Sequence, residues 1–99
     1  MAIVQIHFQV FGKVQRVFFR KYTHAQAEKL RLSGWVRNDP DGTVVGVAEG
    51  SAENIAAMKQ WLSTVGSPKS KIERAVFTNE QQVAARQFAK FEIDRSTSD

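Results

Sequence analysis

A strict alternation of apolar and polar residues near the N-terminus limits the folds open to this chain more than any other feature of its sequence. Over residues 3–11 the apolar positions are Val4, Ile6, Phe8 and Val10, and the polar positions are Gln5, His7 and Gln9. Successive side chains of a strand point to opposite faces of a sheet, so the pattern predicts a half-buried β-strand. We interpret His7 as a solvated residue of the polar face rather than a catalytic base.

A helix is predicted directly downstream, over residues 19–30. Its apolar face is defined by positions spaced four, four and three residues apart, which are Phe19, Thr23, Ala27 and Leu30. This spacing places side chains on one side of an α-helix. Gly34, which can adopt a left-handed conformation at little steric cost, is expected to end this helix.

A second helix is predicted between Ser51 and Gly66. The Ser51 hydroxyl can accept a hydrogen bond from an unpaired N–H of the first turn. Gly66 and the following Pro68 prevent the helix from continuing. The predicted apolar stripe consists of Ile55, Met58, Leu62 and Val65.

The remaining segments predict strands at residues 35–38, 43–49, 72–78 and 88–94. Turn residues at positions 39–42 join the first two as a hairpin. We expect the last two to form a strand pair around a loop rich in Gln and Ala.

The order strand, helix, strand, strand, helix, strand indicates the fold class. Two right-handed crossovers place both helices on one face of a mostly antiparallel sheet. The sequence therefore predicts an α+β protein with a ferredoxin-like βαββαβ sandwich. Residues 1–95 are expected to form a single domain, followed by a polar tail at residues 96–99.

Composition narrows the function classes. The 99 residues carry a formal net charge of +4, which favours anionic partners such as phosphorylated metabolites or nucleic acid. The absence of cysteine excludes disulfides and a thiolate nucleophile, and two histidines are too few for a histidine metal cluster. No segment resembles a signal peptide or a membrane span, so we expect a cytoplasmic protein.

The segment from Phe11 to Arg20 joins the first strand to the first helix and carries Lys13, Arg16 and Arg20. The first N–H groups of a helix have no intrahelical partner, and the helix dipole adds partial positive charge there. Such a loop can bind phosphate, with an arginine adding a bidentate contact. The alternative is that Gly12 only turns the chain and the cations are solvated. The residue types alone leave both interpretations open.

The order of residue types in this segment resembles the phosphate-loop signature of the acylphosphatases, Gly-x-Val-Gln-Gly-Val-x-Phe-Arg. The matching residues are Gly12, Val14, Gln15, Val17, Phe19 and Arg20. The resemblance continues in Gly34-Trp35-Val36-x-Asn38, Asp41-Gly42-Thr43-Val44, Met58-x-x-Trp61-Leu62 and Gly66-Ser67-Pro68, and covers residues 3–94. Arg16 departs from it, because the family pattern has a second glycine at that place.

The resemblance implies a ferredoxin-like fold with an extra short strand at a sheet edge. It also implies hydrolysis of acyl phosphates to carboxylate and inorganic phosphate, without a metal or other cofactor. The implied phosphate-binding loop comprises Gln15, Arg16, Val17, Phe18, Phe19 and Arg20; the implied catalytic residues are Arg20, which anchors phosphate, and Asn38, which positions the attacking water. The implied partners are small acyl phosphates and inorganic phosphate. We expect a monomer that binds neither a membrane nor nucleic acid.

Both implied catalytic residues suit this chemistry. Asn38 offers an acceptor and two donors, and it carries no charge that would repel phosphate. Arg20 stands at a helix N-terminus, where a cation is unfavourable unless an anion compensates it. Taken alone, each residue also has a structural interpretation: Asn38 as a turn former, and Arg20 as an exposed arginine at the start of a helix.

Two other functions stay open at the level of the sequence. A small basic domain of this fold could bind RNA or a phosphometabolite, although Gln5, His7 and Gln9 form a poor surface for base stacking, and the face occupied by Trp35 cannot be assigned. The chain could also be an impaired acylphosphatase because of Arg16. If the loop needs a positive φ there, arginine costs roughly 1–2 kcal/mol, which a domain of about 5–15 kcal/mol stability tolerates.

Overall fold

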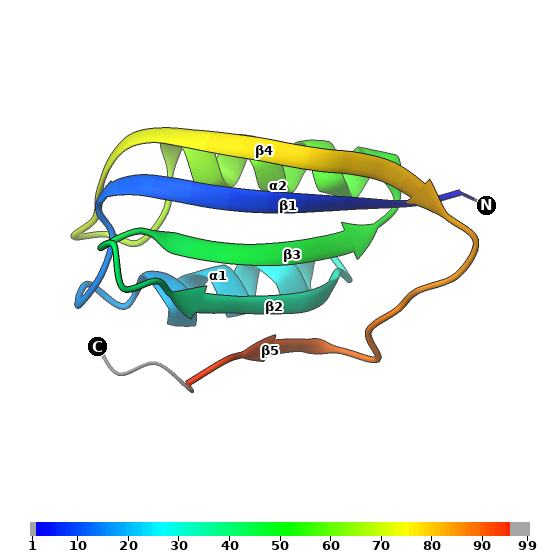
Figure 1. Cartoon of the computed structure of the whole chain (residues 1–99), viewed down its shortest axis with the longest axis horizontal. Coiled ribbons are helices and arrows are strands. Elements are labelled where there is room, and N and C mark those ends of the chain that lie inside the picture. Colours follow the sequence, from blue (N-terminus) through cyan, green and yellow to red (C-terminus); the bar gives the residue numbers. More distant parts are fainter. Residues whose placement is uncertain (1, 96–99) are drawn as a thin grey trace.

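The computed structural model describes residues 2–95 and shows two helices packed on one face of a five-stranded sheet (Figure 1). In chain order the elements are β1 (Ile3–Lys13), α1 (Phe19–Lys29), β2 (Ser33–Asn38), β3 (Val44–Gly50), α2 (Ala52–Thr64), β4 (Lys71–Val83) and β5 (Phe91–Ile93). The strand order is β4-β1-β3-β2-β5, with only the β2–β5 pair parallel among the described strands. This arrangement confirms the ferredoxin-like sandwich and the short extra strand at a sheet edge.

The core lies between the sheet and the two helices. The apolar positions of β1 are buried there, as their alternation predicts; they are Val4, Ile6, Phe8 and Val10. The helices contribute Phe19, Thr23 and Ala27 from α1 and Ile55, Met58 and Leu62 from α2. Since each buried Å² of apolar surface contributes about 25 cal/mol, this single core is the main source of stability in so small a domain.

The C-terminus of α1 differs from the prediction. Arg31, with φ 55°, is the left-handed residue that ends the helix, while the N–H of Leu32 donates to the carbonyl of Ala27 at 2.8 Å. Gly34 instead lies inside β2, where a Cβ would stand 2.0 Å from the carbonyl oxygen of Val47. Gly34 is therefore required by the close approach of β3 rather than by the end of the helix.

The ends of α2 agree with the prediction, but its apolar stripe is one residue too long. The Ser51 hydroxyl accepts a hydrogen bond from the N–H of Asn54 at 3.2 Å, and Gly66 follows the helix with φ 63°. Val65 is 59% exposed, since it caps the helix after the last turn that faces the sheet. Trp61 packs towards the core instead, with its ring centroid 5.8 Å from that of Phe19.

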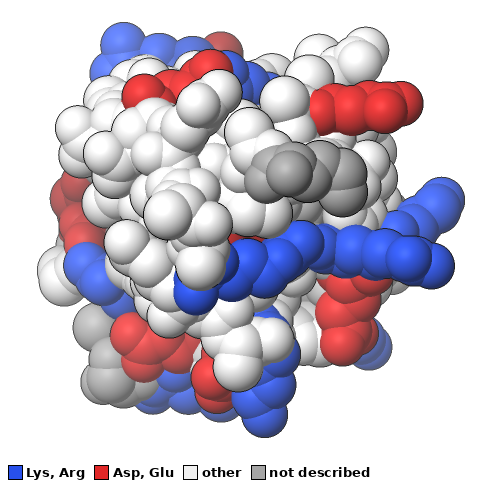
Figure 2. All heavy atoms as spheres, turned by 90° about the vertical axis from the view of Figure 1, so that its right-hand side faces the viewer, with Lys and Arg blue, Asp and Glu red and all other residues white. Residues whose placement is uncertain are grey.

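The predicted pairing of the last two strands is wrong. β4 pairs with β1 and continues to Val83, so part of the Gln-rich stretch belongs to a strand. β5 lies at the opposite edge, beside β2. The connector at residues 84–90 crosses the end of the sheet between these two edges (Figure 1). Figure 2 shows that end of the molecule, where acidic and basic side chains are interspersed.

The connector covers a buried polar cluster, so Gln5 is not on an open face as predicted. Gln5 is 4% exposed, and its Nε2 donates to Oε1 of the fully buried Glu49 at 3.1 Å. The Glu49 carboxylate also accepts from the Ser33 hydroxyl and the N–H of Phe88, both at 2.9 Å. Burial raises the pKa of Glu49, but the hydrogen bonds that it accepts outweigh burial and hold that pKa below its ordinary value.

Within residues 2–95, neither helix has the length and hydrophobicity that crossing a membrane requires.

Candidate active site

The loop between β1 and α1 is shorter than the sequence indicates. β1 continues through Gly12 and Lys13, so the loop proper spans residues 14–18. At Gly12 the pairing of β1 with β4 shifts register, and a Cβ there would stand 2.1 Å from the carbonyl oxygen of Lys71. Gly12 is therefore required by the approach of two strands, and it lies just before the candidate anion site.

Two residues of the loop have left-handed backbone conformations. Arg16 has a φ of 62° and Phe18, which precedes α1, has a φ of 61°. Non-glycine residues seldom adopt this region, and such residues concentrate at functional sites. The place where the family pattern has a glycine is thus one where the backbone favours glycine, and arginine occupies it under strain.

Buried side chains hold the loop in place. Val14, Val17 and Phe19 belong to the core cluster, whereas Phe18 between them is 69% exposed. The side chain of Gln15 donates to the backbone carbonyls of Asp39 and Thr43 at 2.8 and 2.9 Å. These hydrogen bonds tie the loop to the turn between β2 and β3. Because the Gln15 side chain is engaged in them, a ligand could contact this residue only through its backbone.

The loop, the first turn of α1, the end of β2 and the segment after β5 enclose a cavity of about 450 Å³. Its lining residues are Val14, Arg16, Phe18, Phe19, Arg20, Lys21, Asn38, Ile93 and Arg95. Most of the predicted loop and both predicted catalytic residues are among them. Gln15 and Val17 are not, because the Gln15 side chain is hydrogen-bonded to the β2–β3 turn and the Val17 side chain is buried in the core.

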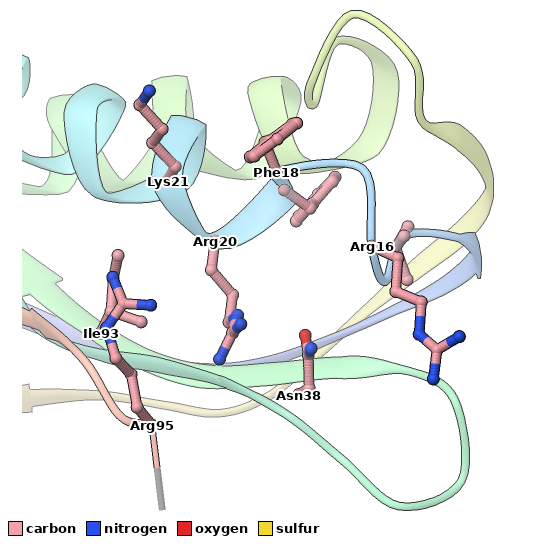
Figure 3. Close-up of a pocket in the computed structure, with 9 residues that line it drawn as sticks. Arg16, Phe18, Arg20, Lys21, Asn38, Ile93 and Arg95 are labelled. Carbon is pink, nitrogen blue, oxygen red and sulfur yellow. The ribbon is translucent and has the colours of Figure 1, made fainter. Parts of the chain in front are cut away.

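Arg20 and Asn38 come from different elements and point into the same pocket (Figure 3). Arg20 lies in the first turn of α1, and its Nη1 atom is buried. Asn38 is the last residue of β2, is 3% exposed and has a buried Oδ1 atom. A guanidinium group and an uncharged amide thus line one cavity at the N-terminus of α1, where the helix dipole places partial positive charge.

Sequence reasoning missed several residues of this pocket. Ile93 and Arg95 reach it only because β5 pairs with β2, which nothing in their local sequence indicates. Lys21 could have been found from its position next to Arg20. The lining includes four cationic side chains and no acidic one among the described residues, so the cavity is suited to an anion.

The other face of the sheet offers little for base stacking. The ring of Trp35 shares a shallow depression with His7 and Gln9, which places Trp35 on this face. The Arg37 guanidinium carbon lies 5.0 Å from the centroid of that ring. A base stacking on Trp35 would therefore compete with the Arg37 guanidinium for this ring.

Comparison with known proteins identifies the family of the chain. Residues 6–93 match the family model described as Acylphosphatase. The chain is 50% identical to Acylphosphatase-1 of Mus musculus and 47% identical to Acylphosphatase-1 of Gallus gallus, in each case over 92 residues that cover 93% of both chains. The solved structure of an acylphosphatase from Bacillus subtilis matches with a TM-score of 0.84 at 33% identity, covering 92% of this chain and 98% of that one. The chain therefore belongs to the acylphosphatase family of hydrolases.

Proposed function

We propose that this enzyme hydrolyses the carboxyl–phosphate bond of small acyl phosphates, with Arg20 as the phosphate anchor and Asn38 positioning the attacking water. The observation that carries the assignment is the presence of both side chains in one cavity at the N-terminus of α1. Neither residue alone would indicate hydrolysis, but a phosphate site with a water-binding amide beside it supports it.

Phosphate binding is assigned to the loop and the first turn of α1, residues 15–20. Backbone N–H groups at a helix N-terminus donate to anions, and the helix dipole favours negative charge there. The planar guanidinium of Arg20 adds two parallel N–H donors that match phosphate oxygens. Bound in this way, the phosphoryl group has its charge neutralised while its phosphorus remains open to attack.

Asn38 is assigned the nucleophilic water. Its Oδ1 can accept a hydrogen bond from the water while its amide carries no charge to repel the phosphoryl group. The water oxygen forms a bond to phosphorus as the bond between phosphorus and the acyl oxygen breaks. The carboxylate leaves without protonation, and a phosphoryl oxygen takes the proton of the water. An amide is a weak base, so the reaction depends on positioning and on the good leaving group.

Arg16 is proposed to leave the fold and phosphate binding intact but to reduce turnover relative to a glycine. Its left-handed backbone carries a strain of about 1–2 kcal/mol, which is small beside a typical stability of about 5–15 kcal/mol. The side chain lines the pocket, so it lies where an acyl group would enter or leave. We also propose a monomer, because Arg20 and Asn38 share a cavity within one chain, so the proposed chemistry needs no residue of a second copy.

Hydrolysis of benzoyl phosphate, followed by its ultraviolet absorbance without added metal, tests the proposal. The protein should release benzoate, and inorganic phosphate should inhibit competitively. Arg74→Gln is a matched control, because Arg74 is an exposed arginine of β4 that does not line the pocket. If the protein is folded and releases no benzoate above the uncatalysed rate, the assignment is wrong.

A further inference from the structure

One wall of the pocket is carried by β5, the shortest of the described strands. Ile93 ends β5 and Arg95 follows it, and both line the cavity that holds the candidate catalytic side chains. β5 has three residues, lies at a sheet edge and pairs in parallel with β2. Parallel pairs are slightly less stable per residue than antiparallel pairs, and short edge elements open locally. The position of this wall therefore depends on how β5 is attached.

Two backbone hydrogen bonds join β5 to β2 at its two ends. The N–H of Gly34 donates to the carbonyl of Lys90 at 3.1 Å, and the N–H of Asp94 donates to the carbonyl of Val36 at 2.8 Å. Phe91 adds an apolar anchor, since only 3% of its surface is exposed. The connector at residues 84–90 leads directly into β5, so the attachment of the connector bears on the position of the strand.

The connector is fastened by two side chains, Glu49 and Arg86, which we call the connector clamp. The buried Glu49 carboxylate accepts a hydrogen bond from the N–H of Phe88 at 2.9 Å. The Arg86 guanidinium donates to the Ser33 hydroxyl at 2.9 Å, and to the carbonyls of Glu49 and Arg31 at 3.1 and 2.9 Å. The Ser33 hydroxyl in turn donates to the Glu49 carboxylate at 2.9 Å. The clamp thus joins the connector to the ends of β2 and β3.

The clamp lies far from the reacting centre. Ser33 pairs with Glu49 at one end of the β2–β3 ladder, whereas Asn38 pairs with Val44 at the other end, beside the pocket. The connector accordingly enters β5 at the end of the sheet opposite the pocket (Figure 1). Burying a carboxylate is costly unless hydrogen bonds compensate it, and well-packed apolar residues would often cover a sheet end at lower cost. An effect of the clamp on the reaction must therefore pass through β5.

We propose that Glu49 and Arg86 are positioning residues, which hold β5 against β2 through the connector and thereby keep the β5 wall of the pocket in place. The kinetic part of this inference rests on the proposed function, because it concerns the pocket in which hydrolysis is placed. The candidate catalytic side chains lie on α1 and β2, so they stay in position when β5 is displaced. Loss of the clamp should therefore weaken binding at the pocket more than it lowers turnover.

Amide hydrogen exchange followed by NMR tests the clamp independently of activity. The probe is the N–H of Asp94, at the end of β5 that is farther from the clamp. Its exchange should be about tenfold faster in Glu49→Gln and in Arg86→Gln, the effect expected when a charge-assisted hydrogen bond is lost. The N–H of Phe8 in the interior strand β1 serves as the reference, so that a change in global stability is discounted.

A matched control separates the clamp from a general loss of charge. Lys59→Gln removes an ion pair with Glu80, which joins α2 to β4 at the opposite edge of the sheet. It removes the same charge as Arg86→Gln and should leave the exchange of Asp94, relative to Phe8, unchanged.

Kinetics with benzoyl phosphate, and its inhibition by inorganic phosphate, test the consequence for the pocket. Glu49→Gln and Arg86→Gln should each raise KM and the Ki of phosphate by about two- to fivefold and change kcat by less than about twofold. The two variants change the net charge in opposite directions, so a rise in Ki that both share cannot come from the general field of the protein. In an Arg95→Gln background the effect of Arg86→Gln should be much smaller, because both changes act on one wall of the pocket.

Each other outcome rejects a defined statement. Unchanged exchange of Asp94 in both clamp variants overturns the clamp, and so does an equal change in Lys59→Gln. Faster exchange with unchanged KM and Ki overturns the positioning role, as does an effect of Arg86→Gln that is undiminished in the Arg95→Gln background. If Glu49→Gln fails to fold, Arg86→Gln carries the test, because its side chain is exposed. Absence of hydrolysis in the unmodified protein overturns the proposed function, whereas the exchange of Asp94 still decides the clamp, so the two failures are distinguishable.

Discussion

Replacing Arg16 with glycine should stabilise the protein. The left-handed conformation at φ 62° costs an L-residue about 1–2 kcal/mol. Glycine removes this cost but increases the entropy of the unfolded chain, which offsets about 0.4–1 kcal/mol. The net gain in the free energy of unfolding is therefore about 0.5–1 kcal/mol. For a domain of this size that corresponds to a rise in Tm of roughly 2–8 °C.

Thermal unfolding followed by circular dichroism measures this gain, and Arg16→Gln is the control. The glutamine variant loses the same charge but keeps a side chain in the strained conformation, so any relief of repulsion among the pocket cations appears in both variants. The difference between the two Tm values isolates the backbone term. Should Arg16→Gly melt no higher than Arg16→Gln, the loop would already accommodate a side chain at this φ and the strain argument would be wrong.

The same glycine variant has a functional consequence. Removing a side chain from the lining of the pocket should increase turnover of benzoyl phosphate, whose acyl part carries no second charge. A variant that is neither more stable nor faster on benzoyl phosphate would contradict both the strain and the obstruction attributed to Arg16.

Four further predictions follow from the site and the fold. Arg20→Gln should lower kcat/KM for benzoyl phosphate by about 10²-fold or more and weaken inhibition by phosphate, because a charge-assisted contact is lost. A folded variant with near-normal hydrolysis would refute the assignment of Arg20 as the phosphate anchor. Asn38→Ala should lower kcat strongly yet leave phosphate inhibition nearly unchanged, and a matching collapse of phosphate affinity would reassign Asn38 to binding. Activity should survive excess chelator, because the sequence has no cysteine and only two histidines; loss restored by a divalent ion would show that a metal is needed. Glu49→Gln should destabilise the protein by about 1–3 kcal/mol at pH 7 through lost charge-assisted hydrogen bonds. Because folding lowers the pKa of Glu49 below its ordinary value of 4.5, this contribution is present above that value and is lost as the pH falls through the folded-state pKa. Denaturant unfolding of the two proteins should therefore converge in acid. A difference that persists unchanged at low pH would contradict the ionised state.

The sequence by itself determined those parts of the molecule that depend on neighbouring residues. The alternation of residues 3–11 identified β1, and the four, four, three spacing identified α1, because strand and helix periods differ. Ser51 was identified as a cap for a similar reason, since its partner is the N–H of Asn54 three residues away. The phosphate-loop motif also predicts Arg20 at the start of α1, which is where the residue lies.

Only the tertiary structure decided which strands are neighbours and which polar groups are buried. β4 and β5 look like a pair in sequence but lie at opposite edges of the sheet, and Arg95 reaches the pocket as a consequence. Gln5 and Glu49 are buried because a distant connector covers them. Strand pairing and the burial of a carboxylate depend on packing between segments that are far apart in the chain. A short stretch of sequence therefore does not predict either of them.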